Sequence, residues 1–255
     1  MDLRALSHNW FNKFYNENVY TYLEKRFFKI VIKYLANIDG AILDAACGAG
    51  NPYLEKMYIN KNRLFGIDID PSVRIRNKLH ENFIIEDLHH MKTERKFQAI
   101  ISVNTWEHLQ SPSIVLKNFY NSLSDRGIII IIAPQRWHYI SIIERILPLN
   151  LKNLAWQLLK GRRNMPYPAF YHLCSQKKLF LEAHRQKLDV MHFSSLEGPP
   201  LWLAKVPPLF IMASLIMQIL NEHYIFRGIR STFIAILKKN ETSCPNTQEW
   251  GDSSH

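Results

Sequence analysis

The chain has 255 residues, 47% of them hydrophobic, enough to bury one substantial core, and α/β chains of this length commonly form a single domain. Its formal net charge of +10 favours an acidic partner: nucleic acid, an anionic membrane surface or a phosphorylated substrate. The cysteines Cys47, Cys174 and Cys244 lie far apart, which excludes a disulfide framework and a zinc site of close cysteine pairs, and indicates a reducing, intracellular compartment.

The N-terminal residues hold no basic region followed by an apolar run, so we expect no signal peptide and predict a cytoplasmic protein. The most apolar stretch, residues 209–220, has about half of the roughly 20 residues that a membrane-spanning helix requires. We therefore expect a buried or interfacial helix there.

Short apolar runs rich in β-branched residues alternate with amphipathic stretches, a pattern typical of βαβ units and a mainly parallel sheet. Prolines after capping residues mark the helix starts. In chain order we expect a helical lead at 10–35, a strand at 41–46, a helix from Pro52, a strand at 63–68, a helix from Asp70-Pro71 to near His80, strands at 83–86 and 98–103, and a helix from Ser111-Pro112.

The second half of the chain begins with the clearest strand. Residues 128–132 are five consecutive isoleucines after a turn, the pattern of a central strand buried on both faces. Residues 135–173 are too long for a plain connection and are predicted to form a helical insertion. A helix at 175–187 and strands at 188–193 and 230–238 complete the order. We expect one domain over residues 1–239, with a helical lead at 1–39, and a disordered tail at 240–255.

Residues 44–50 read Asp-Ala-Ala-Cys-Gly-Ala-Gly between the first strand and the following helix. Glycines at such a turn let the backbone approach a ligand closely, and the amides at the helix start face that ligand. A dinucleotide-binding loop would carry a third small residue three positions after Gly50, where this chain has Tyr53. This departure weakens the interpretation of the loop as a binding site for NAD or FAD.

The same seven residues resemble motif I of class I S-adenosylmethionine-dependent methyltransferases, with Ala46 where the first glycine is usual. The resemblance, closest to the type 11 and type 23 methyltransferase domains, covers residues 40–134 and includes 97–109, where Gln98 replaces the usual aspartate. It implies a Rossmann-like three-layer α/β sandwich with a seven-stranded, mostly parallel sheet of order 3-2-1-4-5-7-6. The last strand is expected to be antiparallel, and the insertion to form a helical lid.

The resemblance also implies S-adenosyl-L-methionine as cofactor and assigns residues to it. Asp68, at the end of the second strand, is expected to bind the ribose hydroxyls, with Asp70 as the competing candidate that instead caps a helix. Asp87 of Glu86-Asp87-Leu88 is expected to meet the adenine amino group. No metal is implied. The expected cofactor-binding residues are Asp44, Ala45, Ala46, Cys47, Gly48, Gly50, Asp68, Ile69, Asp87, Leu88 and Asn104. The expected position is the carboxyl ends of the first, second and fourth strands, beneath the insertion and the region around Trp202.

Methyl transfer from a sulfonium is an in-line displacement that needs a base only when the acceptor must lose a proton. His108 is the candidate catalytic base, because it follows the strand end that faces the cofactor. The alternative is that Glu107 and His108 only hold the loop and helix start together. Aromatic residues of the lead are either packing residues or a cover for the site: Trp10, Phe11, Phe14, Tyr15, Tyr20 and Tyr22.

The methyl acceptor is less defined. Residues 139–147 and 154–163 are apolar periodic runs flanked by cations, which indicate either peripheral contact with the inner face of a membrane or a lid over the active site. We expect a small-molecule, saccharide or lipid-linked acceptor. Nucleic acid is disfavoured, because Asn104-Thr105-Trp106-Glu107 stands where enzymes that methylate base amines carry a D/N/S-P-P-Y/F string. An RNA methyltransferase and a non-catalytic cofactor-binding protein remain alternatives.

Overall fold

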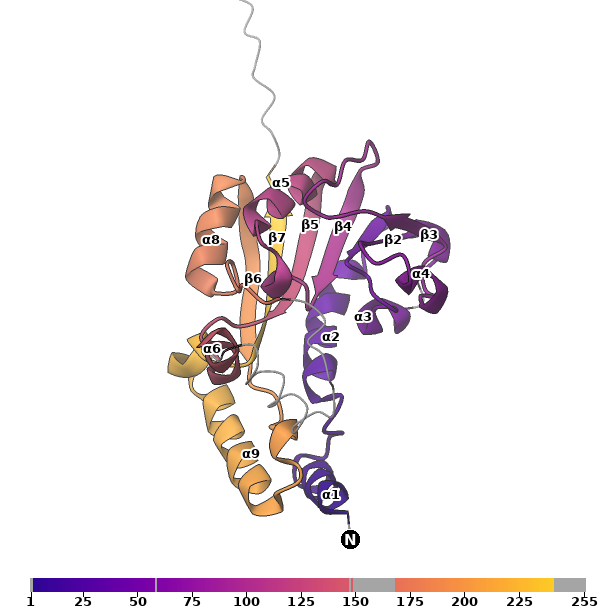
Figure 1. Ribbon diagram of the computed structural model, residues 1–255. Helices are drawn as coiled ribbons and strands as arrows, with labels where there is room; N and C mark the ends of the chain where they lie inside the picture. Colours follow the sequence, from indigo (N-terminus) through magenta and orange to yellow (C-terminus); the bar gives the residue numbers. More distant parts are fainter. Residues whose placement is uncertain (1, 58, 147, 149–167, 241–255) are drawn as a thin grey trace, which may run out of the picture.

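The computed structural model describes residues 2–57, 59–146, 148 and 168–240. Its sheet has the strand order β3-β2-β1-β4-β5-β7-β6 (Figure 1). All neighbouring strands are parallel except β7, which runs antiparallel to β5 and β6, so the predicted topology is confirmed. The strands are β1 Ile42–Ala45, β2 Leu64–Asp68, β3 Asn82–Ile85, β4 Phe97–Val103, β5 Leu123–Pro134, β6 Leu188–Leu196 and β7 Thr232–Lys239.

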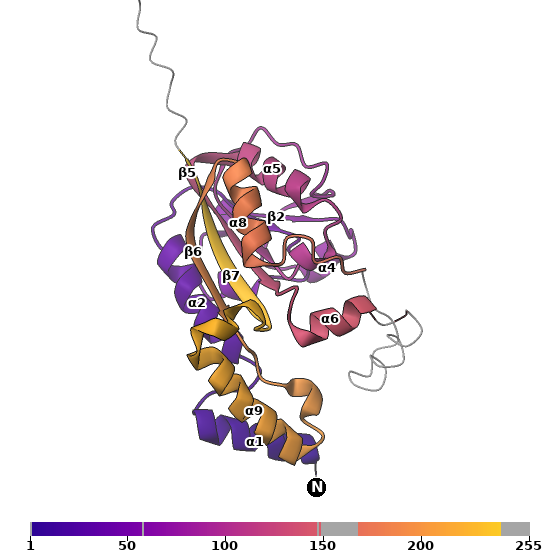
Figure 2. The same ribbon diagram turned by 90° about the vertical axis from the view of Figure 1, so that its left-hand side faces the viewer.

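Helices flank the sheet and extend beyond one of its edges (Figures 1 and 2). The α-helices of the described residues are α1 Leu3–Tyr15, α2 Tyr22–Leu35, α3 Pro52–Glu55, α4 Val73–Arg76, α5 Pro112–Ser122, α6 Tyr139–Ile146, α8 Gln176–Arg185 and α9 Pro207–Glu222. Short 3-10 helices lie at η1 Lys61–Arg63, η2 Trp106–His108, η3 Leu201–Leu203 and η4 Tyr224–Gly228.

The sheet is buried on both faces because alternate residues of each central strand enter different cores. In β5, Ile129 and Ile131 pack in the cluster that contains residues of α5 and α8. Ile128, Ile130 and Ile132 pack on the opposite face, in the cluster that contains residues of α2 and α3. The five consecutive isoleucines therefore serve two cores at once, and the three-layer prediction is confirmed.

Two helical predictions differ from the structure. The helix after β2 was expected to reach His80, but α4 ends at Arg76. Asn77 ends it, because its side-chain oxygen accepts hydrogen bonds from the backbone N–H groups of Leu79 and His80 and turns the chain inward. The lead forms two helices, since Asn16 adopts a left-handed conformation with φ 50° at the end of α1.

A third, smaller core lies between α1 and α9, beyond the sheet (Figure 2). Phe11 and Tyr22 from the lead pack there with Phe210 and Met217 of α9. The described helices include none with both the length and the apolar character needed to cross a bilayer. Of the predicted insertion, residues 147 and 149–167 lie outside the described residues, as do residues 241–255 of the predicted tail.

Candidate cofactor site

A cavity of about 680 Å³ opens at the carboxyl ends of β1, β2 and β4. It occupies the position that the sequence predicts, where ligands bind in open α/β sheets. Most of the predicted site residues line it: Asp44, Ala46, Cys47, Gly48, Gly50, Asp68, Ile69, Asp87, Leu88, Asn104 and His108. Ala45 is the exception, because it is fully buried in the core beneath the cavity.

The loop from Asp44 to Gly50 turns sharply by using the left-handed backbone region. Gly48 has φ 49° and Gly50 has φ 142°, conformations that glycine adopts without strain. Ala46, which stands where the related motif usually has glycine, has φ 57°. The left-handed conformation costs an L-residue about 1–2 kcal/mol of conformational free energy, so the loop keeps its geometry with local backbone strain at Ala46.

A polar network fixes this loop from below. The carboxyl group of Asp44 accepts a hydrogen bond from Asn51 Nδ2 at 2.8 Å, and its Oδ2 lies 3.3 Å from Nε2 of His80. Nδ1 of His80 lies 3.0 Å from Oδ1 of Asn77, whose Nδ2 donates to the carbonyl of Gly48 at 2.8 Å. The buried end of β1 is thereby connected to the glycine turn above it.

Asp44 and His80 form a buried pair whose side chains are only 2% and 0% exposed. Burial raises the pKa of Asp44 to about 7, although the hydrogen bond from Asn51 opposes the shift. Burial also lowers the pKa of His80 to about 4. Because the Asn77 oxygen accepts from Nδ1 of His80, Nε2 is left to accept the proton of Asp44. The two groups hold one proton between them, which leaves the pair without net charge, but Oδ2 of Asp44 and Nε2 of His80 have no hydrogen-bond partner of regular geometry among the described residues.

Asp68 lies at the end of β2 and shapes the cavity. Its Oδ2 accepts from the backbone N–H of Gly48 at 2.9 Å, and its Oδ1 accepts from the N–H of Asp70 at 3.0 Å. Each carboxylate oxygen keeps a further lone pair for a ligand hydroxyl. Asp70 does not line the cavity, and its side chain accepts from the N–H of Ser72 in the turn before α4. This geometry favours Asp68 over Asp70 as the ligand-facing carboxylate.

The segment after β3 closes another side of the cavity with Glu86, Asp87, Leu88 and His89. Oδ1 of Asp87 accepts from the backbone N–H of His89 at 2.9 Å and lies 2.8 Å from Nδ1 of that ring. Burial alone would raise the pKa of Asp87, but the hydrogen bonds and the charge of His89 outweigh it, so the pKa is lowered. Asp87 is therefore an ionised, positioned acceptor.

The lining is acidic although the whole chain carries a formal charge of +10. Its carboxyl groups are those of Asp44, Asp68, Glu86 and Asp87, of which Asp44 belongs to the uncharged pair with His80, and the described lining residues include no lysine or arginine. A cluster of carboxylates attracts a cationic ligand and repels a pyrophosphate. The cavity therefore differs from the usual environment of a dinucleotide.

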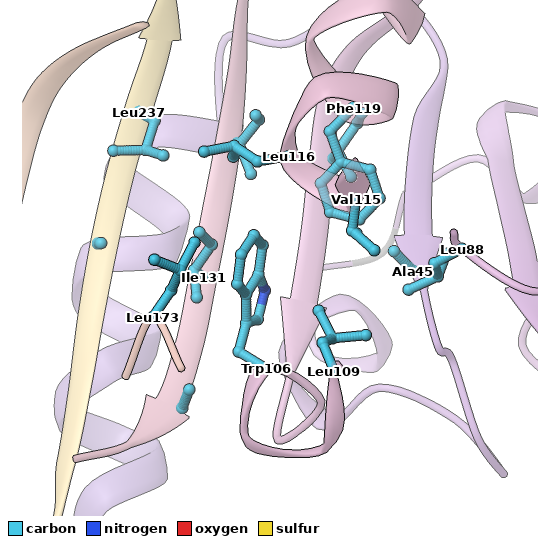
Figure 3. Packing of buried hydrophobic residues seen from close by; sticks show 14 of the residues in the cluster. Ala45, Leu88, Trp106, Leu109, Val115, Leu116, Phe119, Ile131, Leu173 and Leu237 are labelled. Carbon is cyan, nitrogen blue, oxygen red and sulfur yellow. The ribbon is translucent and has the colours of Figure 1, made fainter. Parts of the chain in front are cut away.

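Trp106 anchors the loop that follows β4. Its ring is 1% exposed and packs in the core with Leu116, Phe119 and Ile131 (Figure 3). On either side of it in the sequence, Asn104, with φ 52°, and His108 line the cavity. The buried indole therefore holds both residues at the cavity wall.

The described end of the predicted insertion is held against this loop. The backbone N–H groups of Phe170 and Tyr171 donate to the carbonyl of Glu107 at 2.6 and 3.1 Å. Nδ1 of His108 lies 2.9 Å from the carbonyl oxygen of Pro168. Pro168 and Phe170 thus join the cavity lining, which supports part of the predicted cover. The prediction for Trp202 is wrong, because Trp202 lines a different cavity.

His108 and Glu107 interact directly. Nε2 of His108 lies 3.7 Å from Oε1 of Glu107. Burial raises the pKa of Glu107, and the charge of His108 opposes that shift. His108 therefore has both a structural bond to the Pro168 carbonyl and a position in the cavity wall, so both sequence-based interpretations fit this geometry.

Several residues of the cavity wall and of the polar network beneath it were not predicted from the sequence. Asn51 carries a recognisable signal, since it precedes Pro52 and caps α3 by accepting from the N–H of Tyr53. His80 and Asn77 carry no local signal, because their roles depend on contacts with Asp44 and Gly48. The remaining unpredicted lining residues are Pro52, Glu86, His89, Val103, Thr105, Leu109, Gln110, Pro168 and Phe170. None of the aromatic residues proposed from the lead lines this cavity.

A mostly parallel sheet with a glycine turn after β1 and a carboxylate at the end of β2 defines a Rossmann-like nucleoside-binding protein. The chain belongs to the methyltransferase domain family, whose family model matches residues 16–186, more than half of its length. The predicted resemblance to class I S-adenosylmethionine-dependent methyltransferases is thereby confirmed. No curated protein matches the sequence.

Solved structures share the fold at low sequence identity. The chain is similar to the N-methyltransferase NodS from Bradyrhizobium japonicum WM9 in complex with S-adenosyl-L-homocysteine, with 13% identity and a TM-score of 0.54 over 86% of this chain and 87% of that one. It is similar to coclaurine N-methyltransferase bound to N-methylheliamine and the same nucleoside, with 16% identity and a TM-score of 0.54 over 85% and 72%. It is also similar to the [4+2]-cyclase SpnF, with 13% identity and a TM-score of 0.53 over 84% and 81%.

Proposed function

We propose that the cavity binds S-adenosyl-L-methionine and that the protein transfers its methyl group to a small, amphiphilic acceptor. The observation that carries the proposal is the acidic lining at the carboxyl ends of β1, β2 and β4, in a chain that is basic overall. The NodS and coclaurine N-methyltransferase structures contain S-adenosyl-L-homocysteine, the product that remains after methyl transfer.

The residues present fit this cofactor. The cavity of about 680 Å³ lies within the range of roughly 300–1,000 Å³ for small-molecule sites. Asp68 would accept hydrogen bonds from the ribose hydroxyls, and Asp87 from the adenine amino group. The turn at Gly48, where an added Cβ would meet nothing within 4 Å, leaves room for the methionine end of the molecule.

When bound, the cofactor supplies a methyl group activated by a sulfonium. The protein contributes orientation and exclusion of water, which suffice for an in-line displacement at a neutral nucleophile. Asn104 and His108 form the wall next to the end of β4, and Phe170 adds to it from the described end of the predicted insertion. An acceptor held against this wall would be kept in one orientation relative to the cofactor.

His108 would act as a base for an acceptor that must lose a proton. The Pro168 carbonyl can only accept a hydrogen bond, so the neutral ring carries its proton on Nδ1 and keeps the lone pair on Nε2. Replacement of His108 by alanine should lower turnover more than tenfold if this role is essential. A smaller loss, together with weaker protection of the 168–171 segment in hydrogen exchange, would assign it to positioning instead.

Peripheral membrane contact is the second part of the proposal. Leu209, Met212, Ile216 and Ile219 are exposed at helical spacing on one face of α9. An exposed apolar stripe on a basic protein suits an anionic bilayer surface. The described part of the predicted membrane segment adds the exposed Ile143 of α6, whereas residues 154–163 lie outside the described residues.

Co-sedimentation with phosphatidylserine vesicles at low salt tests this contact. The wild-type protein should pellet with the vesicles, and the Met212→Glu/Ile216→Glu variant should remain in the supernatant. Ile75→Glu is the matched control, because Ile75 is 85% exposed and belongs to α4 rather than α9. Loss of binding in both variants, or in neither, would count against a specific role of α9.

The transfer itself is tested by incubating the protein with cofactor labelled in the methyl group and a cell extract, followed by mass spectrometry. The proposal predicts labelled product together with S-adenosylhomocysteine. SpnF, whose fold is similar, is a cyclase, so a different activity on this fold is the specific alternative. Cofactor binding without any labelled product across polar and lipid fractions would favour that alternative.

A further inference from the structure

A second cavity, of about 200 Å³, lies farther along the same edge of the sheet. Pro134 at the end of β5 and Leu196 at the end of β6 are both register partners of Thr232, the first residue of β7. Residues that follow β5 and β6 therefore emerge together at the edge that also holds the cofactor cavity. The described linings of the two cavities share no residue.

The wall of this cavity contains a buried acid and a buried imidazole. Oε1 of Glu197 lies 3.2 Å from Nε2 of His138, and both side chains are 7% exposed. The other carboxyl oxygen of Glu197, Oε2, is buried and has no hydrogen-bond partner among the described residues. A buried carboxylate oxygen left without a donor costs about 1–3 kcal/mol, so this group is poised to accept a donor from a ligand.

Arg230 is a buried cation that interacts with the charge of Glu197, but the hydrogen bonds that it donates within the described residues all go to backbone carbonyl groups. Arg230 donates four of its five guanidinium hydrogens to the carbonyl groups of Ser195, Leu220, Asn221 and His223. Burial lowers the pKa of Arg230 and the charge of Glu197 opposes that shift, so the two charges interact without a direct bond. Because Arg230 partly balances the carboxylate, a neutral donor can occupy the cavity as well as a cationic one.

Aromatic rings make up much of the remaining wall. Tyr20, Tyr139 and Trp202 line the cavity, and Nε1 of Trp202 donates to the hydroxyl of Tyr139 at 3.2 Å. This bond fixes the two rings relative to each other. Rings of this kind contact flat or apolar bodies and stabilise nearby cations through their faces. The described lining includes no lysine or arginine that would compete for Glu197.

We propose that this cavity binds an N–H or O–H donor carried on an aromatic or similarly apolar body, with Glu197 accepting the hydrogen bond. This inference rests on the proposed function: the second cavity is the subsite that anchors the methyl acceptor at the same edge of the sheet as the cofactor cavity. His138 lies against Oε1 at 3.2 Å, and its Nε2, like Oε2 of Glu197, has no hydrogen-bond partner of regular geometry among the described residues, which leaves Oε2 for the ligand. Trp202 and Tyr139 select a ring-bearing ligand.

Three probes of nearly the same shape test the proposal: phenethylamine, phenethyl alcohol and propylbenzene. Their affinities for the full-length protein are measured by ligand-observed NMR titration. The amine, the alcohol or both should bind at least tenfold more tightly than the hydrocarbon, and the ratio between the two reports whether a charge is preferred. Equal affinity of all three probes, or binding of none, would overturn the proposal.

Variants test whether the preference for the donor probes over propylbenzene arises in this cavity. Glu197→Gln should reduce the tenfold preference to less than threefold, and Trp202→Ala should weaken all three probes. The matched control is Asp189→Asn, which removes one carboxylate from the opposite end of β6 and should change nothing. An unaltered preference in Glu197→Gln, or an equal loss in Asp189→Asn, would contradict the assignment.

Cofactor-site integrity is measured separately by titrating S-adenosylhomocysteine into the same preparations. Unchanged affinity in Glu197→Gln shows that the variant is folded, so its lost preference counts for the proposal. If the wild-type protein binds the donor probes but not S-adenosylhomocysteine, the proposed function fails while the second site stands.

Discussion

Replacing His80 by alanine removes the imidazole that lies 3.3 Å from Oδ2 of Asp44. If both groups were charged, their attraction at this distance would be about 5 kcal/mol at an effective dielectric constant of roughly 20. A neutral hydrogen bond contributes about 0.5–1.5 kcal/mol. Because burial raises the pKa of Asp44 and lowers that of His80, we expect a coupling energy of about 1–2 kcal/mol between them.

A double-mutant cycle measures this coupling. The free energy of unfolding in urea is determined for the wild-type protein, Asp44→Ala, His80→Ala and the double variant. Asp87→Ala and His89→Ala form the matched control pair, since their side chains are partly exposed and should couple by less than about 1 kcal/mol. A coupling near 5 kcal/mol for the buried pair would refute the shared-proton interpretation, and a coupling near zero would refute the contact itself.

Three further predictions concern the same region. Gly66→Ala should lower the free energy of unfolding by about 1–3 kcal/mol in urea, because its Cβ would lie 2.9 Å from both Cys47 Sγ and His80 Cγ; an unchanged value would contradict that packing. Ala46→Gly should raise the free energy of unfolding by about 0.5–1 kcal/mol, since relief of the left-handed strain at Ala46 exceeds the added entropy of the unfolded chain. A decrease in the free energy of unfolding would argue against strain. The folded pKa of Asp44 lies above its usual 3.8, so its stabilising contribution is present at low pH and lost as pH rises through about 7. His80 offsets this between pH 4 and 6.5, which leaves a net decline that begins near pH 6.5 and levels off above about pH 7. Asp44→Asn should abolish this decline in urea titrations at pH 6, 7 and 8; the same decline in the variant would exclude Asp44 as its source.

The sheet and its glycine turn were predictable because their signals are local. Five isoleucines at 128–132 can only be buried from both sides, and Asn51-Pro52 marks a helix start. The strand order came from the family resemblance rather than from any local pattern. Asp68 was predictable from the same family resemblance, since it ends the next strand after the motif.

Residues that act through distant contacts were not predictable in this way. His80 enters the core only because Gly66, in the strand before it, has no side chain to fill that space. A glycine inside a strand is a signal of close approach, but it does not say what approaches. Trp202 was predicted to cover the cofactor, whereas the pairing of β6 with β7 carries it to the second cavity.

Isothermal titration of S-adenosylhomocysteine into the wild-type protein, Asp68→Ala and Asp70→Ala tests the central claim most directly. Asp68→Ala should weaken binding at least tenfold, because hydrogen bonds to a carboxylate contribute about 1.5–3 kcal/mol each. Asp70→Ala removes a neighbouring carboxylate that does not line the cavity, and should bind within about threefold of the wild type. Saturable one-to-one binding with this order of affinities is the predicted result. No binding by the wild-type protein, or full affinity in Asp68→Ala, would contradict a nucleoside site at the carboxyl ends of β1, β2 and β4.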